Sequence, residues 1–589
     1  MKLYKWLFVV IAFFFIANGC GKSITPMPNT QQHIEKPHPI TSRKAIGGIR
    51  IAWDYTSLKK VSSSAKGERY CGYARVIQGR DNALICVYEA DGNVVIVKSN
   101  DLGITWTSPI VVASKKDGVN MAVPDILELK DSSILVCYNP RPAGNEPSKR
   151  FAIRTKKSYD GGNTWQNESL LYEADYRFEN GCWEPSAIQL PNGEIQLFFA
   201  NEGVYTNSTE QNISMFRSND NGLTWTKKPE MVSFRAGKRD GMPSPLLLKN
   251  GNEIAFAIED NGFGDFKPYV IKNTLTQNWS QPVDATSNRR TYALSEKIEE
   301  HIYAGAPYLR QLKTGETILS YQGTEGRINR TSFAEMKVVI GDENAQHFTR
   351  KSTPFNIPDN KSGLWNSLSV LNDNTVIALT STNAFSGNTE IWMIKGHIIP
   401  ELNAIQESLV IDGLMNEKGW KNTLPIFIGQ KSATQVKAAV SYDKNNLYIL
   451  ANISDALVST NASTLENNDG LSISIDAQNK SYEAPDKGIF KFFITADNQV
   501  LIKEGSNGKW VQKINVSGFQ SFVKRKQGGY FQEISIPWRV LGGKPAINTR
   551  IGLNMSLTEN SGKSEADYVE SIAGNIDSAS YSWTTLLLK

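Results

Sequence analysis

The sequence predicts an all-β protein in which a six-bladed β-propeller is followed by a C-terminal β-sandwich. An eight-residue motif recurs three times in the first half of the chain, and a strand–turn–strand unit recurs six times. Beyond about residue 400 both repeats stop, but short apolar runs with a period of two residues continue. Repeats of this size are typical of propeller blades, whereas period-2 runs alone are typical of a sandwich.

The repeated motif reads Ser-x-Asp-x-Gly-x-Thr-Trp and occupies residues 99–106, 158–165 and 218–225. In such a turn the Asp carboxylate accepts backbone N–H groups, the Gly supplies a positive φ, and the Trp packs on the sheet. Weaker copies follow near residues 273–279 and 341–348. The motif resembles the Asp-box of sialidase-like propellers, which implies a tight turn between the two outer strands of a blade.

The second repeat is an apolar strand, a short turn and another apolar strand. Its copies pair residues 74–78 with 83–88, 124–129 with 134–138, 185–190 with 195–199, 245–248 with 253–258, 307–312 with 317–321, and 366–371 with 375–379. Six such units arranged radially form a propeller of six blades. We expect residues 48–53 to add a strand that closes the ring, so that the propeller domain spans residues 46–400.

The N-terminus has the pattern of an export signal. Lysines at positions 2 and 5 precede a short apolar run, and small residues follow it up to Cys20. The run is too short to span a membrane in a mature protein. The cysteine after the small residues resembles a bacterial lipobox, which implies cleavage before Cys20 and a lipid on its sulfur. We expect residues 1–20 to be a signal peptide, 21–45 a flexible tether, and the protein to be anchored to the cell envelope, at the periplasmic or the outer face of the outer membrane.

Composition excludes some classes of partner. The formal net charge is only +5 over 589 residues, and no dense stripe of Lys and Arg is present, so nucleic acid is not an expected partner. The cysteines Cys71, Cys86, Cys137 and Cys182 match neither a disulfide framework nor a zinc site. We therefore expect buried thiols, no structural metal in the large domain, and a monomer.

Propeller topology places candidate functional residues on one face. First strands begin and second strands end at the face opposite the Asp-boxes, so Asp101, Asp160 and Asp220 are predicted to be structural. Acids, amides and aromatic rings around a cavity suit a sugar. The residues that we expect to bind substrate there are Arg75, Arg141, Trp183, Asn201, Arg239, Asp240, Tyr308, Gln322, Trp365 and Asn366.

Glycoside cleavage needs two carboxyl groups that flank one bond. Glu184 and Glu259 lie in the third and fourth repeats, on the same predicted face, and both are enclosed by apolar or aromatic neighbours. Such surroundings raise the pKa of a carboxyl group toward that of a useful acid. The competing carboxylates on this face are Glu89, Glu202, Asp125, Asp240 and Asp260.

Several motifs resemble glycoside hydrolase family 93. They include Gly181-Cys-Trp-Glu184-Pro, Arg239-Asp-Gly-Met242-Pro, Gly305-Ala-Pro-Tyr308 and Trp365-Asn-Ser367. The resemblance implies a retaining exo-α-1,5-L-arabinanase that releases arabinose or short arabino-oligosaccharides and needs no cofactor. It also implies Glu184 as nucleophile, Glu259 as acid/base, and about 5 Å between the two carboxyl groups.

Two other functions remain open. An exo-sialidase shares the Asp-boxes and holds its acidic substrate with arginines and a Tyr–Glu pair; Arg75, Arg141, Arg239, Arg327 and Tyr321 are available. However, Tyr73-Ala-Arg75-Val stands where the Arg-Ile-Pro start of a sialidase is expected. A surface lipoprotein that captures glycans without cleaving them is the second alternative.

The C-terminal region, residues 405–589, carries alternating apolar runs at 436–440, 447–451, 471–475, 489–494 and 531–536. Ile411-Asp-Gly413 with Trp420, and Asn468-Asp469, resemble parts of a family 9-like carbohydrate-binding module. The resemblance implies sugar binding and a structural calcium ion with Asp469 as a ligand. Candidate stacking platforms are Trp510, Trp538, Trp583 and Tyr530, for each of which core packing is the alternative role.

Overall fold

The computed structural model describes residues 48–62, 68–399, 401–414, 426–429, 434–482, 484–514, 516–572, 580 and 583–589. The predicted signal peptide with Cys20 and the predicted tether lie outside the described residues, as does Trp420. Within the described ranges, no helix is long and apolar enough to cross a membrane. In the part of the chain that the structure describes, three short 3₁₀ turns are present, at η2 (Phe178–Asn180), η3 (Thr331–Phe333) and η5 (Leu465–Asn467).

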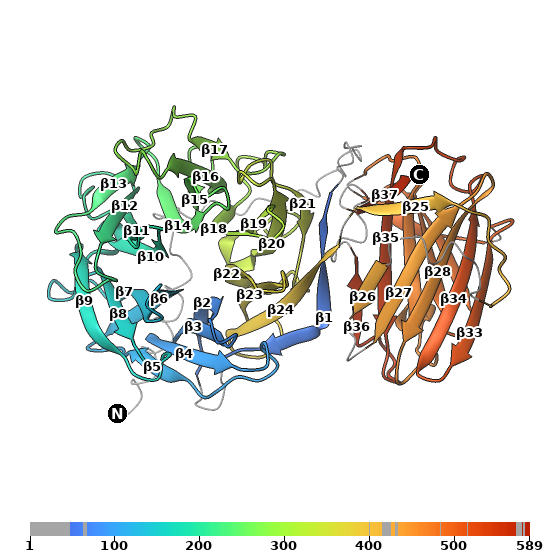
Figure 1. Cartoon of the computed structure of the whole chain (residues 1–589), viewed down its shortest axis with the longest axis horizontal. Coiled ribbons are helices and arrows are strands. Elements are labelled where there is room, and N and C mark those ends of the chain that lie inside the picture. Colours follow the sequence, from blue (N-terminus) through green and yellow to red (C-terminus); the bar gives the residue numbers. More distant parts are fainter. Residues whose placement is uncertain are drawn as a thin grey trace, which may run out of the picture.

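Six four-stranded antiparallel sheets form the ring seen in Figure 1, so the predicted six-bladed propeller is confirmed. From the channel outward, blades 1 to 3 are β2 (Cys71–Gln78), β3 (Leu84–Ala90), β4 (Asn93–Ser99) and β5 (Ile110–Ala113); β6 (Val119–Glu128), β7 (Ile134–Pro142), β8 (Ala152–Ser158) and β9 (Gln166–Glu173); and β10 (Cys182–Gln189), β11 (Ile195–Asn201), β12 (Asn212–Ser218) and β13 (Glu230–Ser233).

Blades 4 to 6 have the same order. They are β14 (Asp240–Leu247), β15 (Glu253–Asp260), β16 (Lys267–Thr274) and β17 (Arg290–Tyr292); β18 (Ala304–Gln311), β19 (Thr317–Gly323), β20 (Glu335–Gly341) and β21 (Thr349–Ser352); and β22 (Gly363–Val370), β23 (Val376–Thr382), β24 (Glu390–Ile399) and β1 (Arg50–Lys60).

The N-terminal strand β1 closes the ring, as predicted. It pairs antiparallel with β24, from Arg50 opposite Ile399 to Lys60 opposite Trp392. Trp53 on this strand is fully buried and donates its indole N–H to the Ser352 hydroxyl at 3.0 Å. The sixth sheet therefore combines the two ends of the propeller domain and leaves no open edge between blades 6 and 1.

A bulge interrupts the start of every innermost strand. The pairing of the first two strands shifts register at the same place in each blade, and one residue there has a positive φ. These six residues are Tyr73, Val123, Glu184, Met242, Ala306 and Trp365. Because a bulge redirects a side chain out of the strand's alternation, it is a common device next to functional sites.

The Asp-boxes adopt the predicted turns at the opposite face. In the first copy the Asp101 carboxylate accepts the Thr105 backbone N–H at 2.9 Å, and the Ser99 hydroxyl accepts the Gly103 N–H at 2.7 Å. The same bonds recur in the other two copies, and all three motif glycines have φ between 80° and 89°. These Asp side chains are therefore turn-forming groups, far along the strands from the bulges.

The C-terminal domain is a two-layer sandwich whose sheets are joined through β25, so this part of the predicted fold is also confirmed. One layer follows the order β32-β31-β30-β29-β35-β37 and the other β27-β28-β34-β33. The strands are β25 (Leu402–Gln406), β26 (Ile426–Gly429), β27 (Gln435–Tyr442), β28 (Asn446–Ser454), β29 (Gly470–Asp476), β30 (Phe490–Thr495), β31 (Val500–Ser506), β32 (Lys509–Lys513), β33 (Gln520–Lys526), β34 (Gly529–Pro537), β35 (Arg550–Glu559), β36 (Tyr568–Ser571) and β37 (Thr584–Leu588).

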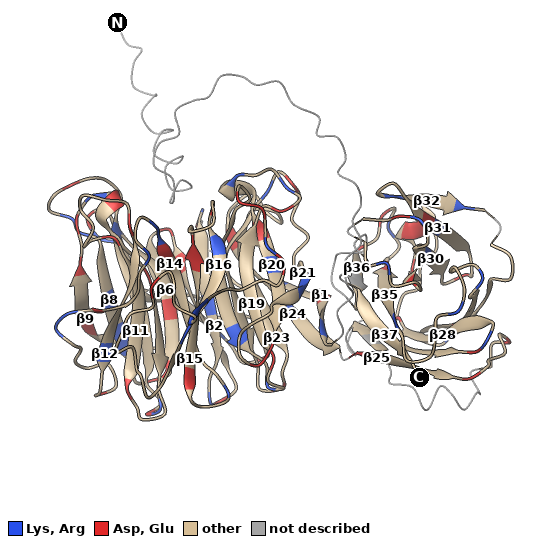
Figure 2. Ribbon diagram, turned by 90° about the horizontal axis from the view of Figure 1, so that it is seen from above, with Lys and Arg blue, Asp and Glu red and all other residues tan. Residues whose placement is uncertain are grey.

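The two domains lie side by side, with acidic and basic residues dispersed over both (Figure 2). Arg50 at the start of β1 is buried and donates to the carbonyl of Trp583, from the last segment of the sandwich, at 2.9 Å.

Trp538, Trp583 and Tyr530 are at most 2% exposed, so the alternative of core packing is confirmed for them. Trp510 on β32 is partly exposed and remains a candidate platform. The four cysteines of the propeller are free and buried, as expected.

Candidate active site

The six bulge residues converge at the top of the propeller channel. Five of them are apolar or aromatic and contact one another across the ring, although they come from five different blades. The sixth is Glu184 on β10, with φ of 47°. The bulge of blade 3 thus places a carboxylate in a ring that is otherwise apolar, which is the main geometric feature of the site.

Below this ring the channel narrows to a small polar cavity. Glu184 and Met242 border it together with polar groups from five blades: Arg75, Asp125, Ser186, Ser244 and Tyr308. The Arg75 guanidinium lies 4.6 Å from the centre of the Tyr308 ring and donates to the Ala74 carbonyl at 2.9 Å. Arg75 and Tyr308, both predicted to bind substrate, therefore form the floor beneath Glu184.

Arg141 holds the Glu184 carboxylate. Its Nη2 donates to Glu184 Oε1 at 2.9 Å, and its Nε donates to the Asn139 side-chain oxygen at 2.7 Å. The guanidinium also lies 4.8 Å from the centre of the Trp183 ring. Burial raises the pKa of Glu184, but the charge and hydrogen bond of Arg141 oppose that increase. Arg141 therefore favours the ionised form of Glu184.

Glu259, at the end of β15, has a different environment. Its Oε2 accepts the backbone N–H of Ala306, the bulge residue of blade 5, at 2.9 Å. Gly241 and Gly305 leave the space that the carboxyl group fills, since a Cβ on either would lie 3.0 Å or less from it. Burial raises the pKa of Glu259 to about 7, and the charge of Glu184 adds to the increase. The site thus contains two neighbouring carboxyl groups whose pKa is raised by burial: Arg141 opposes the increase at Glu184, whereas the pKa of Glu259 reaches about 7.

Aromatic and charged residues surround this pair. Tyr73 and Trp365 stack with their ring centres 4.5 Å apart. On the other side, Trp183 donates its indole N–H to Glu202 at 2.8 Å, and Glu202 pairs with Arg239 at 2.5 Å. Flat apolar faces beside ion pairs and hydrogen-bonding groups are the features that bind the two faces and the hydroxyls of a sugar ring.

Four residues predicted to bind substrate have hydrogen-bond or ion-pair partners within the propeller. Asp240 is fully buried and pairs with Arg290 at 2.6 Å, and Asp260, a competing carboxylate, contacts the same arginine. Asn201 bonds within its own blade to Ser214, and Asn366 bonds to the Gly363 carbonyl. Gln322 is fully buried, and its side-chain oxygen accepts the Trp365 backbone N–H at 2.8 Å. Gln322 therefore helps to position Trp365, which lies in the site.

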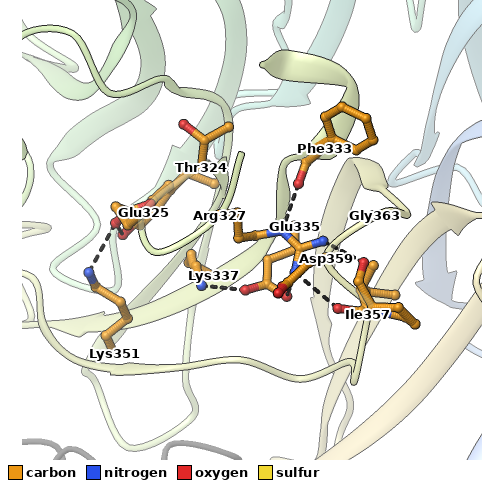
Figure 3. Close-up of polar contacts among 12 residues, drawn as sticks. Thr324, Glu325, Arg327, Phe333, Glu335, Lys337, Lys351, Ile357, Asp359 and Gly363 are labelled. Atoms are coloured by element: carbon orange, nitrogen blue, oxygen red, sulfur yellow. Dashed lines mark hydrogen bonds and ion pairs between the residues drawn. The ribbon is translucent and has the colours of Figure 1, made fainter. Parts of the chain in front are cut away.

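Of the residues considered for a sialidase, Arg75, Arg141 and Arg239 lie close enough to Glu184 for their charges to act on it, whereas Arg327 and Tyr321 have partners within blade 5. Arg327 is buried in blade 5, where it bonds to Glu335 and to backbone carbonyls of Phe333 and Ile357 (Figure 3). The Tyr321 hydroxyl donates to Glu325 at 2.7 Å, within a cluster that also includes Lys351. Both residues thus stabilise loops of blade 5. Nearer the channel, Arg141 is paired with Glu184 and Arg239 with Glu202, whereas Arg75 contacts the Ala74 carbonyl and the Tyr308 ring.

Two features of the site were not predicted from the sequence. One is the ring of bulges, for which a signal exists: Pro follows the bulge residue in four of the six blades, at positions 124, 185, 243 and 307. The other is the environment of Glu89 on β3, a residue that the sequence offers only as a competing carboxylate. Glu89 is 7% exposed, and burial raises its pKa to about 7, which makes it the second protonatable carboxyl group at this face.

The sandwich holds one cluster of acids. Ligand oxygens of Asp455, Asp469 and Glu559 lie within 4.8 Å of one another. One oxygen of Asp455 and one of Glu559 are buried without a hydrogen-bond partner. Burial raises the pKa of both Asp469 and Glu559 to about 7. Hard oxygen ligands of this kind fit a calcium ion, whose charge would compensate the buried carboxylates.

Comparison with known proteins assigns the sandwich to a domain family. Residues 411–585 match the family model described as carbohydrate family 9 binding domain-like, which confirms the predicted resemblance. Endo-1,4-beta-xylanase A of Thermotoga neapolitana is 29% identical over 154 residues, which are 25% of this chain and 13% of that protein. The xylanase of Thermoanaerobacterium saccharolyticum is 26% identical over 204 residues. The chain thus spans less than a fifth of these curated relatives, and the match concerns the C-terminal domain.

Among solved structures, a protein of unknown function from Dyadobacter fermentans is similar over 60% of this chain and all of its own length, with 17% identity and a TM-score of 0.47. The GH93 alpha-L-arabinofuranosidase of Fusarium graminearum, solved with arabinobiose, covers 58% of this chain and 97% of its own, with 17% identity and a TM-score of 0.45.

The raised pKa of Glu259 predicts how the stability of the propeller depends on pH. Because its folded pKa of about 7 exceeds the value near 4.3 of an unfolded chain, its ionisation destabilises the fold progressively as pH rises from about 4 to 7. Glu259→Gln keeps an acceptor for the Ala306 N–H but cannot ionise. We expect this variant to be more stable than the wild type at pH 8, by about 1–3 kcal/mol, and little changed at pH 4.5.

Thermal unfolding of the propeller at both pH values measures this difference. Glu253→Gln, at the other end of the same strand, is the matched control and should show no such pH dependence. An equal effect of Glu259→Gln at pH 4.5 and pH 8 would contradict the assignment of a raised pKa.

Proposed function

We propose that the protein is a glycoside hydrolase and that the Glu184–Glu259 pair cleaves the glycosidic bond. The observation that carries this proposal is the difference between two neighbouring carboxyl groups: Glu184 is ion-paired with Arg141, whereas Glu259 is buried with a pKa of about 7. One group can attack or stabilise positive charge while the other protonates the leaving oxygen, which is the division of roles that glycoside cleavage requires.

The motifs similar to family 93 support a retaining mechanism, and the difference between the two carboxyl groups supports the assignment of their roles. Glu184, whose ionised form Arg141 favours, would attack the anomeric carbon and form a glycosyl-enzyme intermediate. Glu259 would donate its proton to the departing oxygen and then, as a carboxylate, accept a proton from the water that hydrolyses the intermediate. The separation of about 5 Å between the carboxyl groups stays a prediction.

For the substrate we propose α-1,5-L-arabinan, cleaved from a chain end to arabinose or short arabino-oligosaccharides. The motifs similar to family 93 support this choice. The charge pattern supports a neutral sugar, because Arg141 and Arg239 are already paired with glutamates and Arg75 lies below the ring with its guanidinium on a backbone carbonyl and Tyr308. A sialidase needs such arginines for its acidic substrate.

The C-terminal domain and the N-terminus suggest where the enzyme works. We propose that the sandwich binds polysaccharide and is stabilised by a calcium ion held by Asp455, Asp469 and Glu559. We further propose that the chain is exported and anchored through a lipid on Cys20. Both features would keep the catalytic domain close to insoluble polysaccharide outside the cytoplasm.

The activity can be tested on purified protein with linear arabinan and, separately, sialyl-lactose. We expect arabinose or arabinobiose from arabinan, with the first product retaining its anomeric configuration by NMR, and no sialic acid. Glu184→Gln and Glu259→Gln should each lower kcat by roughly 10²–10⁴-fold, whereas Glu253→Gln should not. Release of sialic acid alone would overturn the substrate assignment, and binding without turnover would favour the glycan-capture alternative.

Calcium removal should destabilise the sandwich and spare the propeller. Since Asp469 and Glu559 lose their compensating cation, we expect EDTA to lower the melting temperature of the C-terminal transition and added calcium to restore it. Asp455→Asn should abolish this dependence on calcium. An unchanged melting temperature in EDTA would argue against the site.

Anchoring can be tested by expressing the full-length chain in a Gram-negative bacterium. We expect the wild type to fractionate with membranes and to incorporate labelled fatty acid, and Cys20→Ser to do neither. Release of the wild type as an unlabelled secreted protein would show that Cys20 is not lipidated.

A further inference from the structure

The geometry that places Glu259 is repeated on the opposite side of the channel. In each blade, one residue of the second strand pairs with the first-strand residue that precedes the bulge. In blades 1 to 6 this second-strand residue is Glu89, Asn139, Ala200, Glu259, Gln322 and Ser381. Only blades 1 and 4 have a glutamate there, and in both it faces a glycine, Gly72 or Gly241. Two blades lie between them in either direction, so they lie on opposite sides of a six-bladed ring.

The two glutamates have similar surroundings. Glu259 accepts the backbone N–H of Ala306 at 2.9 Å, and Glu89 lies near that of Val123, where it is stabilised by this N–H; both N–H groups belong to the bulge residue of the following blade. Burial raises the pKa of each to about 7. The sequence around Glu89 shows none of this, because Val-Tyr-Glu89-Ala reads as an ordinary strand end.

Glu89 forms no ion pair with the described residues. Other buried carboxylates in this propeller are neutralised by a nearby cation, such as Asp240 by Arg290 and Glu335 by Lys337. Among the described residues, no cation is placed within 4.0 Å of the Glu89 carboxylate. Burying a carboxyl group without such a partner is costly, which indicates a use other than holding the fold together.

Arg141 connects Glu89 with the proposed nucleophile. Its guanidinium interacts with both Glu184 and Glu89, and it lies 5.7 Å from the centre of the Tyr73 ring. Glu259 and Glu89 therefore lie at opposite sides of a site that contains Glu184. A sugar held against Glu184 would have its scissile oxygen toward Glu259 and other ring hydroxyls toward Arg141 and Glu89.

We propose that Glu89 is a specificity-determining residue that binds a hydroxyl of the neutral sugar held at Glu184, on the side away from Glu259; this rests on the proposed glycosidase function. A carboxyl group can accept a hydrogen bond from a hydroxyl in either protonation state and can also donate one when protonated. The adjacent Arg141 offers donors to a neighbouring hydroxyl. A sugar that lacks a hydroxyl at this position would leave the buried carboxyl group unsatisfied and would be rejected.

The test compares Glu89→Ala and Glu89→Gln with Glu259→Gln on an arabino-oligosaccharide. We expect Glu89→Ala to raise KM about 10-fold or more while kcat stays within about 3-fold, since one substrate hydrogen bond is lost. Glu89→Gln, which keeps an acceptor, should show a smaller increase, and Glu259→Gln should lose kcat instead. Glu253→Gln serves as the control, and thermal unfolding confirms that each variant is folded.

Two results would overturn the proposal. Unchanged KM and kcat in both folded Glu89 variants would show that the carboxyl group does not contact substrate. Loss of kcat in Glu89→Gln equal to that in Glu259→Gln, at unchanged KM, would make Glu89 a proton donor.

Failure of the glycosidase function would be visible separately. If the wild type hydrolyses no glycan, calorimetric binding of arabinobiose to wild type and Glu89→Ala replaces the kinetic readout. A Kd about 10-fold weaker in the variant would support Glu89 as a sugar ligand, and equal Kd values, or absence of binding to the wild type, would reject it.

Discussion

The left-handed residue at the start of each innermost strand is the constraint on which the site depends. In a regular strand, the side chains at this end of the blade would alternate between the two neighbouring blades. The bulge breaks that alternation once per blade and turns one side chain toward the axis. Five of these side chains are apolar or aromatic and pack together. The sixth, Glu184, is therefore surrounded by them but is not completely buried.

This enclosure brings two carboxyl groups with different partners into one small site. Both lose hydration, which raises the pKa of each. Only Glu184 has a cation in hydrogen-bonding contact, and Asn139 and Trp183 fix that cation in place. Glu259 receives a single backbone N–H. The two carboxyl groups therefore differ in their hydrogen-bonding and charged partners rather than in how deeply they are buried.

Much of the architecture could be predicted from the sequence, because it depends on patterns. The repeats predict the blade number, the closing strand and the face opposite the Asp-boxes, and burial by apolar neighbours points to Glu184 and Glu259. The orientation of side chains at strand ends could not be predicted in the same way. Glu259 and Asp260 are adjacent, yet one lies beside the channel and the other pairs with Arg290 inside the blade. The same difference recurs in other blades: Gln322 occupies the position equivalent to Glu259, whereas Asn201 occupies the position equivalent to Asp260.

Closure by the first strand also affects how the chain folds. Lys60 on β1 bonds to Glu390 on β24, 330 residues further along the sequence, and Arg50 bonds to Trp583, which is 533 residues away. The first contact cannot form until about two-thirds of the 589 residues have been synthesised, and the second not until almost all of them have. Such non-local pairing slows folding and leaves the edges of the first and last blades exposed in the meantime. The ring therefore closes as a late event, and a chain truncated before β24 lacks the partner of β1.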